Sequence, residues 1–177
     1  STIVQNYSAS FISNQAIDGS WTGTNGVEEQ LKRDLGLLFA HQVTNDFSYL
    51  TAVRDNIDYI LNTFWISSNG GLESYSNPAA SDQFFECNQQ LFMVAVRRLN
   101  GRSGGLYNYL AQGEQAWHFL TDNNYANIDM YVYNFTNHST FFSYRDVQED
   151  GTFQDVDLWK GSNEIGTALW GMVLNYD

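Results

Sequence analysis

The chain has 177 residues, with 20 acidic and 8 basic side chains and a formal net charge of −12. Apolar residues make up 43% of it, which excludes a disordered chain, and the length suffices for one domain with a hydrophobic core. A protein that binds phosphates needs clustered lysine and arginine. The only tight basic pairs are Lys32-Arg33 and Arg97-Arg98, so nucleic acid and anionic membrane surfaces are excluded as partners. No apolar stretch approaches the length that spans a bilayer, and we expect no membrane span.

Residues 1–25 are polar, rich in Asn, Ser and Gly, and show no helical period. This pattern predicts an irregular N-terminal arm, followed by a single domain over residues 26–177. The domain is expected to begin with a helix from about Val27 to Gln42. Its leucines fall on one helical face: Leu31, Leu35 and Leu38.

A second helix is expected directly after Asn45-Asp46, which offers side chains that can cap a helix N-terminus. Its apolar residues keep one stripe over several turns: Leu50, Val53, Ile57, Ile60, Leu61 and Phe64. Helices joined by so short a connection are antiparallel neighbours. The first part of the domain is therefore predicted to be a helical hairpin.

The third helix is predicted to start at Asn77-Pro78, a capping residue followed by proline at the first helical position. From Leu91 to Val96 it is apolar nearly all round, which is typical of a helix buried on several sides. Arg97-Arg98 and Gly101 are expected to close it. A fourth helix, capped near Ser103, would complete a second hairpin, with one apolar face: Leu106, Leu110, Gly113, Trp117 and Leu120.

After the fourth helix the spacing of the apolar residues changes from a helical period to alternation along the chain. Alternating residues predict strands at 128–133 and 140–147, joined by a turn at 136–139. A polar loop then leads to a last helix, unpartnered in this chain, with five inward residues: Ile165, Leu169, Met172, Val173 and Tyr176. The predicted fold class is therefore mainly α, with antiparallel helical hairpins and a small β-hairpin.

A degenerate internal repeat joins these elements. An Asx-Gly turn runs into an aromatic or apolar residue, and a helical pattern opens roughly ten residues later. The three copies are Asp18-Gly19-Ser20-Trp21, Asn69-Gly70-Gly71-Leu72 and Asp150-Gly151-Thr152-Phe153. The repeat predicts stacked helical hairpins whose turns gather at one end.

Hairpins joined by Asp-Gly-Ser-Trp turns resemble the α/α-toroid folds of carbohydrate-active enzymes, the glycoside hydrolases and polysaccharide lyases. Residues 39–50, FAHQVTNDFSYL, are similar to a recurrent toroid hairpin, and residues 160–170, KGSNEIGTALW, look like an inner toroid helix. The resemblance covers residues 18–177 and implies a toroid-type fold that acts on or binds a polysaccharide. The chain has room for fewer hairpins than a closed toroid needs. It is thus a fragment of a larger enzyme, an open helical array, or a subunit that packs against copies of itself.

A glycan-cleaving site needs paired carboxylates, or a Tyr/His pair with Arg for elimination. Asp82 and Glu86 are four residues apart, on one face of the predicted third helix near its start. In toroids the site lies where inner-helix N-termini and their loops converge. The resemblance therefore adds Glu164, near the start of the last helix, and His41, at a helix end. The helix dipole alone favours acids at N-termini, so a structural role stays open for each.

Aromatic residues make up 16% of the chain. Their rings serve either as core filler or as flat platforms for sugars. The candidates for a substrate-binding face lie at the turns and beside the polar loop: Trp21, Tyr75, Tyr144 and Trp159. Core packing is the alternative for each of them.

The segment from Asp146 to Asp157 is the densest acidic cluster in the chain. Its carboxylates could offer oxygen ligands to Ca²⁺, with Asp150, Asp155 and Asp157 as the predicted ligands. Their spacing is not that of an EF-hand, and a solvated acidic turn is the alternative. The three histidines have no metal-ligand spacing, which argues against zinc.

Cysteine usage and polar composition bear on the compartment. The single cysteine, Cys87, rules out an internal disulfide framework and is expected to be a buried small hydrophobe. Three glycosylation sequons, at Asn6, Asn134 and Asn137, fit an extracellular or cell-surface location. Two functions remain open: a secreted protein that handles a polysaccharide through an acidic, aromatic face, or a non-catalytic structural subunit that forms homo-oligomers, with Ca²⁺ as a candidate ligand.

Overall fold

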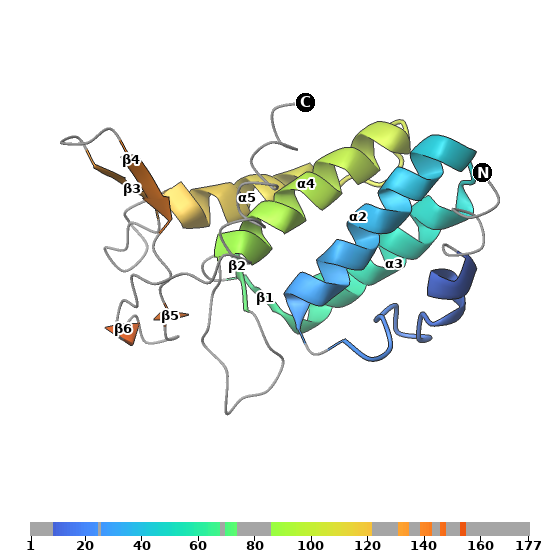
Figure 1. Ribbon diagram of the computed structural model, residues 1–177, viewed down its shortest axis with the longest axis horizontal. Coiled ribbons are helices and arrows are strands. Elements are labelled where there is room, and N and C mark those ends of the chain that lie inside the picture. The colour runs from blue at the N-terminus through green and yellow to red at the C-terminus, as the bar shows by residue number, and fades with distance from the viewer. Residues whose placement is uncertain are drawn as a thin grey trace.

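The computed structural model describes residues 9–24, 26–67, 70–73, 86–121, 131–134, 139–142, 146–147 and 153–154. Within these ranges the chain is mainly helical, with small antiparallel β-hairpins, which confirms the predicted fold class (Figure 1). The long helices are α2 (Val27–Thr44), α3 (Ser48–Thr63), α4 (Glu86–Arg102) and α5 (Leu110–Thr121).

The first predicted hairpin is formed by α2 and α3. Asn45 ends α2 in the left-handed conformation, with φ 57°, and its N–H donates to the His41 carbonyl at 2.7 Å. The Asp46 Oδ1 atom then accepts the Ser48 N–H at 3.0 Å. Of the two residues predicted to cap the second helix, Asn45 therefore ends α2, and the Asp46 side chain accepts a backbone N–H at the start of α3.

The second predicted hairpin is formed by α4 and α5. Helix α4 continues one residue past Gly101, and the chain reverses at Gly104 and Gly105, whose φ angles are 63° and 85°. The Gly105 N–H donates to the Asn100 carbonyl at 2.8 Å, which closes the helix. Helix α5 begins at Leu110, later than expected. The predicted start of the third helix at residues 77–78 lies outside the described residues.

The predicted inward face of the fourth helix is wrong in part. Gly113 is buried, as predicted, but Leu106 is 66% exposed and Trp117 is 47% exposed, and the buried residues Ala116 and Phe119 were not predicted. A Cβ atom on Gly113 would lie 2.7 Å from the Val96 Cγ2 atom, so the glycine permits close approach of α5 to α4. The helix therefore places the small residue Gly113 against α4, while Phe119 packs against Gly71 of β2.

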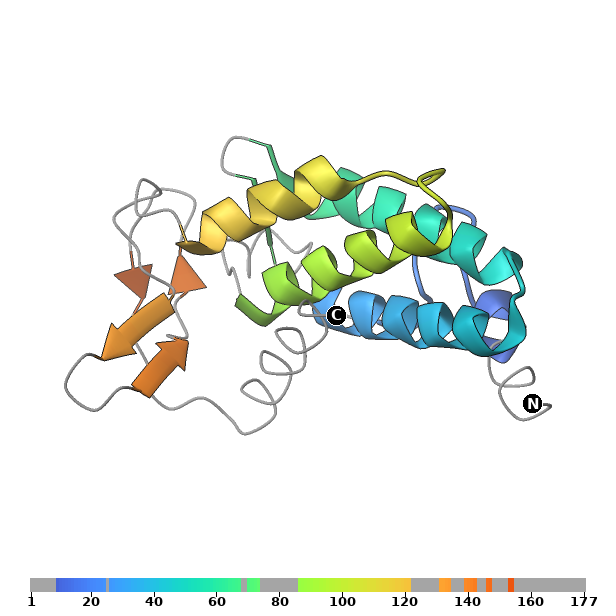
Figure 2. The same ribbon diagram turned by 90° about the horizontal axis from the view of Figure 1, so that it is seen from above.

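Helices α2 and α4 lie side by side and run in the same direction, with α3 and α5 behind them (Figures 1 and 2). Two contacts between their C-terminal ends fix this parallel arrangement. The Arg98 guanidinium lies 5.3 Å from the centre of the Phe39 ring, and the Arg102 Nη2 donates to the Gln42 Oε1 at 2.8 Å. The hairpins thus form two layers, with α2 and α4 in one of them.

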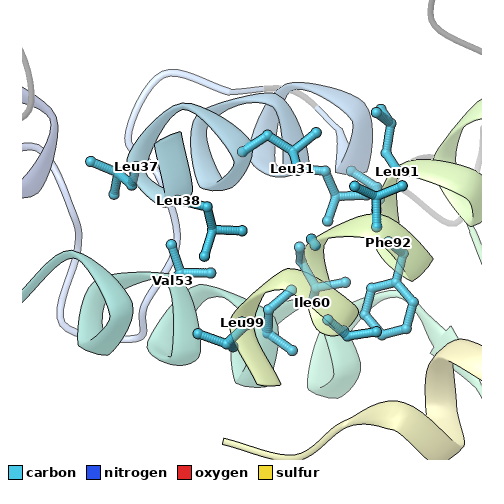
Figure 3. Close-up of a cluster of buried hydrophobic side chains, with 14 of the residues drawn as sticks. Leu31, Leu37, Leu38, Val53, Ile60, Leu91, Phe92 and Leu99 are labelled. Atoms are coloured by element: carbon cyan, nitrogen blue, oxygen red, sulfur yellow. The ribbon is translucent and has the colours of Figure 1, made fainter. Parts of the chain in front are cut away.

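The core lies between α2, α3 and α4. Leu38, Val53 and Leu99 point into this space from the three helices (Figure 3). The run from Leu91 to Val96 is buried throughout, which confirms the prediction that this helix is covered on several sides. Each large apolar side chain buried in this way contributes about 1.5–3 kcal/mol to stability.

In the part of the chain that the structure describes, three short antiparallel strand pairs accompany the helices. The predicted pair is present as β3 (Tyr131–Asn134) and β4 (Ser139–Phe142), in continuous register, but residues 146–147, predicted as the end of the second strand, pair elsewhere. Two pairs were not predicted: β1 (Trp65–Ile66) with β2 (Gly71–Leu72), and β5 (Asp146–Val147) with β6 (Phe153–Gln154). Strands of two residues carry too little alternation to be recognised. The predicted last helix, at residues 160–177, lies outside the described residues.

The prediction of an irregular arm over residues 1–25 is wrong for the described part, 9–24. Residues 9–13 are helical, and Gln15 and Trp21 form an antiparallel bridge. The Gln15 Nε2 donates to the Ala52 carbonyl of α3 at 2.7 Å, and Trp21 is 1% exposed. This segment is a packed part of the helical domain, because its tryptophan fills the core.

Replacement of Gly19 by alanine is expected to lower the free energy of unfolding by about 3 kcal/mol or more. Gly19 has φ +90°, and a Cβ atom there would overlap the backbone carbonyl of Asp55 in α3. Backbone cannot move aside as a flexible side chain can. Chemical denaturation of both proteins gives the difference.

Gly23→Ala is the matched control. Gly23 also has a positive φ, +79°, but a Cβ atom there meets nothing within 4 Å. Gly23→Ala should lower the free energy of unfolding by only about 1 kcal/mol, the cost of placing alanine at a positive φ. Equal losses for the two variants would contradict the close approach of Gly19 to α3.

Candidate functional site

A buried glutamine holds each described turn to the helix that follows it. The Gln30 Oε1 accepts the Trp21 N–H at 2.9 Å. The Gln89 Oε1 accepts the Leu72 N–H at 3.0 Å, and its Nε2 donates to the Leu72 carbonyl at 2.7 Å. Both glutamines are the fourth residue of their helix, since α2 begins at Val27 and α4 at Glu86. The first two turns therefore gather at one end, as the repeat predicts, and equivalent residues hold them.

The first turn also buries a carboxyl group. The Trp21 Nε1–H donates to the Asp34 Oδ1 at 2.9 Å, and Asp34 is fully buried. Burial raises the pKa of Asp34 well above its ordinary value, against the smaller lowering by the Trp21 hydrogen bond. Burial therefore favours the protonated form of the Asp34 carboxyl group. Trp21 is no platform for a sugar, contrary to the prediction, because its ring is enclosed in the core.

His41 and Glu86 lie at opposite ends of the α2–α4 pair. Glu86 is the first residue of α4, whereas His41 is near the last, Arg102, whose charge helps to lower the pKa of His41. A helix of 17 residues is about 25 Å long. Those two residues therefore cannot act on one bond.

His41 is a buried imidazole, and its surroundings favour the neutral form. Burial is the larger cause of its lowered pKa, Arg102 adds to it, and Asp46 opposes it. Its Nδ1 atom has no hydrogen-bond partner in the part of the chain that the structure describes. With 9% of its surface exposed, it is poorly placed to reach a substrate.

The other predicted site residues lie outside the described residues: Asp82, Glu164, Tyr75, Tyr144, Trp159, Asp150, Asp155 and Asp157. Strands β5 and β6 lie within the predicted calcium segment, Asp146–Asp157. Within the described ranges, no group of three His, Cys, Asp or Glu side chains could hold a metal ion. The calcium ligands and the carboxylate pair therefore stay predictions.

A different set of side chains meets at the C-terminal ends of α2 and α4. We call the surface formed by Phe39, Gln42, Arg98 and Arg102 the arginine face. Arg98 stacks on the ring of Phe39, and Arg102 is hydrogen-bonded to Gln42. Phe39 is 38% exposed, Gln42 is exposed, and both arginines are partly exposed. The face thus combines a planar apolar ring with N–H donors.

The charges on this face are not neutralised locally. Neither Arg98 nor Arg102 takes part in any ion pair among the described residues, and the Nε atom of each has no hydrogen-bond partner there. Burial lowers the pKa of Arg102, and the neighbouring charge of Arg98 lowers it further. Two like charges one helical turn apart favour an anion between them.

Arg54 on α3 shows the contrasting arrangement. It pairs with Asp55 at 2.6 Å and lies 5.4 Å from the Tyr107 ring centre. Asp58 accepts the Tyr109 hydroxyl at 2.6 Å. Burial, and then this bond to Asp58, raise the pKa of Tyr109. Here a cation stacked on an aromatic ring is compensated by carboxylates. Among the described residues Arg98, Arg102 and Arg33 have no such ion pair, and Arg33 donates to the Thr22 carbonyl instead.

The sequence analysis missed both Asp34 and the arginine face. A carboxylate three residues after Leu31, on the apolar face of the first helix, was the available signal for Asp34. The Arg98–Arg102 spacing of four places them on one helical face. However, only the pairing of two helices more than fifty residues apart brings these arginines to Phe39 and Gln42.

Comparison with known proteins gives no relative: no family model, no curated protein and no solved structure matches this chain. No helix within the described ranges is both long and apolar enough to cross a membrane, in agreement with the prediction.

Replacement of Asp34 by asparagine is expected to flatten the dependence of stability on pH. The raised pKa of Asp34 means that its contribution to stability is complete below about pH 4, the ordinary pKa, and is lost as the pH rises through the folded-state value. The unfolding free energy of the wild type should therefore fall over that range relative to Asp34→Asn. Urea denaturation at successive pH values measures the slope, independently of the absolute stability of the variant.

Asp18→Asn is the control for this experiment. Hydrogen bonds from Ser20 lower the pKa of Asp18, so its contribution is present above about pH 4 and lost as the pH falls. That variant should keep the wild-type slope above pH 5. An unchanged slope in Asp34→Asn would show that Asp34 is not protonated in the folded protein.

Proposed function

We propose that this protein is a carbohydrate-active protein of the α/α-toroid type, which binds a polysaccharide along the layer formed by α2 and α4. The observation that carries this proposal is the repeat itself. Two hairpins place their first helices parallel and adjacent, and Gln30 and Gln89 hold the preceding turns in equivalent ways. A regular array of this kind generates an extended binding surface.

The arginine face supplies suitable chemistry for a sugar. A pyranose ring has apolar C–H faces and a rim of hydroxyl groups, so it is bound by flat apolar groups flanked by hydrogen-bonding side chains. Phe39 offers the flat group, and Gln42 and Arg102 offer the polar groups beside it. None of these side chains is needed to fill the core.

Hydrolysis or elimination remains part of the proposal as a further step. Asp82, Glu86 and Glu164 are the proposed acid and base residues. Of these, Glu86 begins α4, at the end of the layer where the Gln30 and Gln89 turns lie. His41 is not proposed for that site, because it lies at the other end. An extracellular location and a Ca²⁺ ion held by the Asp146–Asp157 segment are also proposed.

A second function, assembly into homo-oligomers, is favoured by one observation. Several large apolar side chains on the described surface are exposed, among them Val43 at 61% and Phe47 near the α2–α3 connection. Apolar surface of this kind is typical of contact sites between proteins. In this alternative the chain is a structural subunit, and a second copy of the chain covers the apolar surface at Val43 and Phe47.

Phe39→Ala is expected to weaken polysaccharide binding by about tenfold, because it removes the exposed ring and the stacking partner of Arg98. Affinity electrophoresis in gels cast with a panel of neutral and acidic polysaccharides would measure this. Trp117→Ala is the matched control, since Trp117 is an exposed aromatic residue on α5. Loss of binding in the control alone, or wild-type migration unaffected by every polysaccharide, would contradict the proposal.

The particle mass in solution separates the two functions. For the carbohydrate-binding function we expect a monomer by analytical ultracentrifugation, unchanged by a calcium chelator. A large oligomer would instead make assembly the function. Its dissociation by the chelator would place Ca²⁺ at the contacts between copies.

A further inference from the structure

We propose that residues 9–24, the N-terminal segment, form a pH-dependent latch. The latch is closed on α2 and α3 while the buried Asp34 carboxyl is protonated, and it opens as a unit when that carboxyl ionises. The geometry behind it is a carboxyl group buried in contact with Trp21, in a segment that is attached to the helices mainly by hydrogen bonds. These residues lie outside the arginine face, so the latch does not depend on the proposed carbohydrate function.

The N-terminal segment has a single apolar anchor. Trp21 is its only fully buried apolar side chain. Hydrogen bonds provide the other attachments to α3: the Gln15 Nε2 donates to the Ala52 carbonyl at 2.7 Å. The Asn56 Nδ2 also donates to the Gly19 carbonyl at 3.0 Å. The rest of the buried core belongs almost entirely to the helical hairpins, so the segment can leave while those hairpins stay folded.

The hydrogen bonds around Asp34 suit the protonated form. Its Oδ1 accepts the Trp21 Nε1–H at 2.9 Å, but its Oδ2 is buried without a partner among the described residues. The amide donors of the same buried group are directed to other acceptors: the Gln30 Nε2 to the Thr24 hydroxyl, and the Asn56 Nδ2 to the Gln30 Oε1. The Asn56 Oδ1, also buried without a described partner, is an acceptor. An ionised carboxylate here would have one donor in place of its water shell, which opposes ionisation in the closed state.

No neighbouring charge compensates an ionised Asp34. The charged residues on the surrounding elements are Asp18 in the N-terminal segment, Lys32 and Arg33 within one turn of Asp34 on α2, and Arg54, Asp55 and Asp58 within one turn of Asn56 on α3. The three cations bind other groups, which are Glu28, the Thr22 carbonyl and Asp55, respectively. The buried run of α4, residues 91–96, is apolar. None of these charges contributes to the pKa of Asp34, which is raised by burial and lowered to a smaller extent by the Trp21 hydrogen bond.

The raised pKa fixes the direction of the effect. In the closed latch Asp34 keeps its proton, whereas in the open latch it meets water and takes its ordinary pKa of about 4. The closed form is therefore fully stabilised below about pH 4 and loses that stabilisation as the pH rises through the closed-state pKa. Between the two pKa values each opening releases one proton, so the open population should rise by about tenfold per pH unit.

Amide hydrogen exchange of the full chain, followed by mass spectrometry between about pH 5 and pH 9, tests the latch. The measured quantity is the protection factor, the slowing of exchange relative to the unfolded chain at the same pH. For the peptide that contains the Trp21 and Thr22 amides, we expect the protection factor to fall by about tenfold per pH unit. Amides in residues 91–96 of α4 should stay at least about a hundredfold better protected throughout, because they exchange only when the core opens.

Asp34→Asn removes the ionisable group and keeps an oxygen that can accept the Trp21 Nε1–H. In this variant the protection factor of the N-terminal segment should not change with pH. Asp18→Asn is the matched control, because it removes an exposed carboxyl group from the same segment and should keep the wild-type dependence. The wild-type measurement decides the question by itself if Asp34→Asn does not fold.

Three results would overturn the latch. The first is a wild-type protection factor of the segment that does not change with pH, and the second is an equal dependence on pH in Asp34→Asn. The third is equal protection of the segment and of α4 at every pH, which would mean that ionisation of Asp34 opens the whole domain. Polysaccharide binding is measured separately, so none of these results affects the proposed function.

Discussion

Two buried glutamines, Gln30 and Gln89, tie the turns of this protein to its helices, and the arrangement of α2 and α4 depends on them. A turn residue such as Trp21 or Leu72 enters the core with its backbone N–H, which must find an acceptor once water is excluded. The side-chain amide of the fourth residue of the following helix provides this acceptor. Both hairpins use the same solution, so the turn before each first helix is held at the fourth residue of that helix.

That parallel alignment has consequences at both ends of the layer. At the starts of α2 and α4 it gathers turns and buried amides, together with the Asp34 carboxyl, whose pKa is raised by burial. At the other end it gathers cations, since Arg98 and Arg102 come to lie beside Phe39 and Gln42. One end is thus closed by hydrogen bonds within the protein, and the other keeps donors for a ligand.

The surface of the domain departs from a simple division into apolar inside and polar outside. Helix α5 presents Gly113 to α4 and leaves Trp117 exposed, because a close helix contact requires a small residue. Arg54, in contrast with the two arginines of α4, is neutralised by Asp55 and stacked on Tyr107. On the arginine face an exposed aromatic residue, Phe39, lies beside two arginines that make no ion pair among the described residues.

The sequence by itself determined the helices of the first hairpin, the buried run from Leu91 to Val96, and the β3–β4 hairpin, because each depends on periodicity within a short segment. It also indicated the repeat of turns. Only the tertiary structure decided that Trp21 is enclosed by Asp34 and Gln30, and that α5 turns Gly113 inward. The same holds for Arg98 and Arg102, which meet Phe39 and Gln42 across α2 and α4. Each of these contacts joins separate elements, and a local pattern does not record the partner that a side chain will meet.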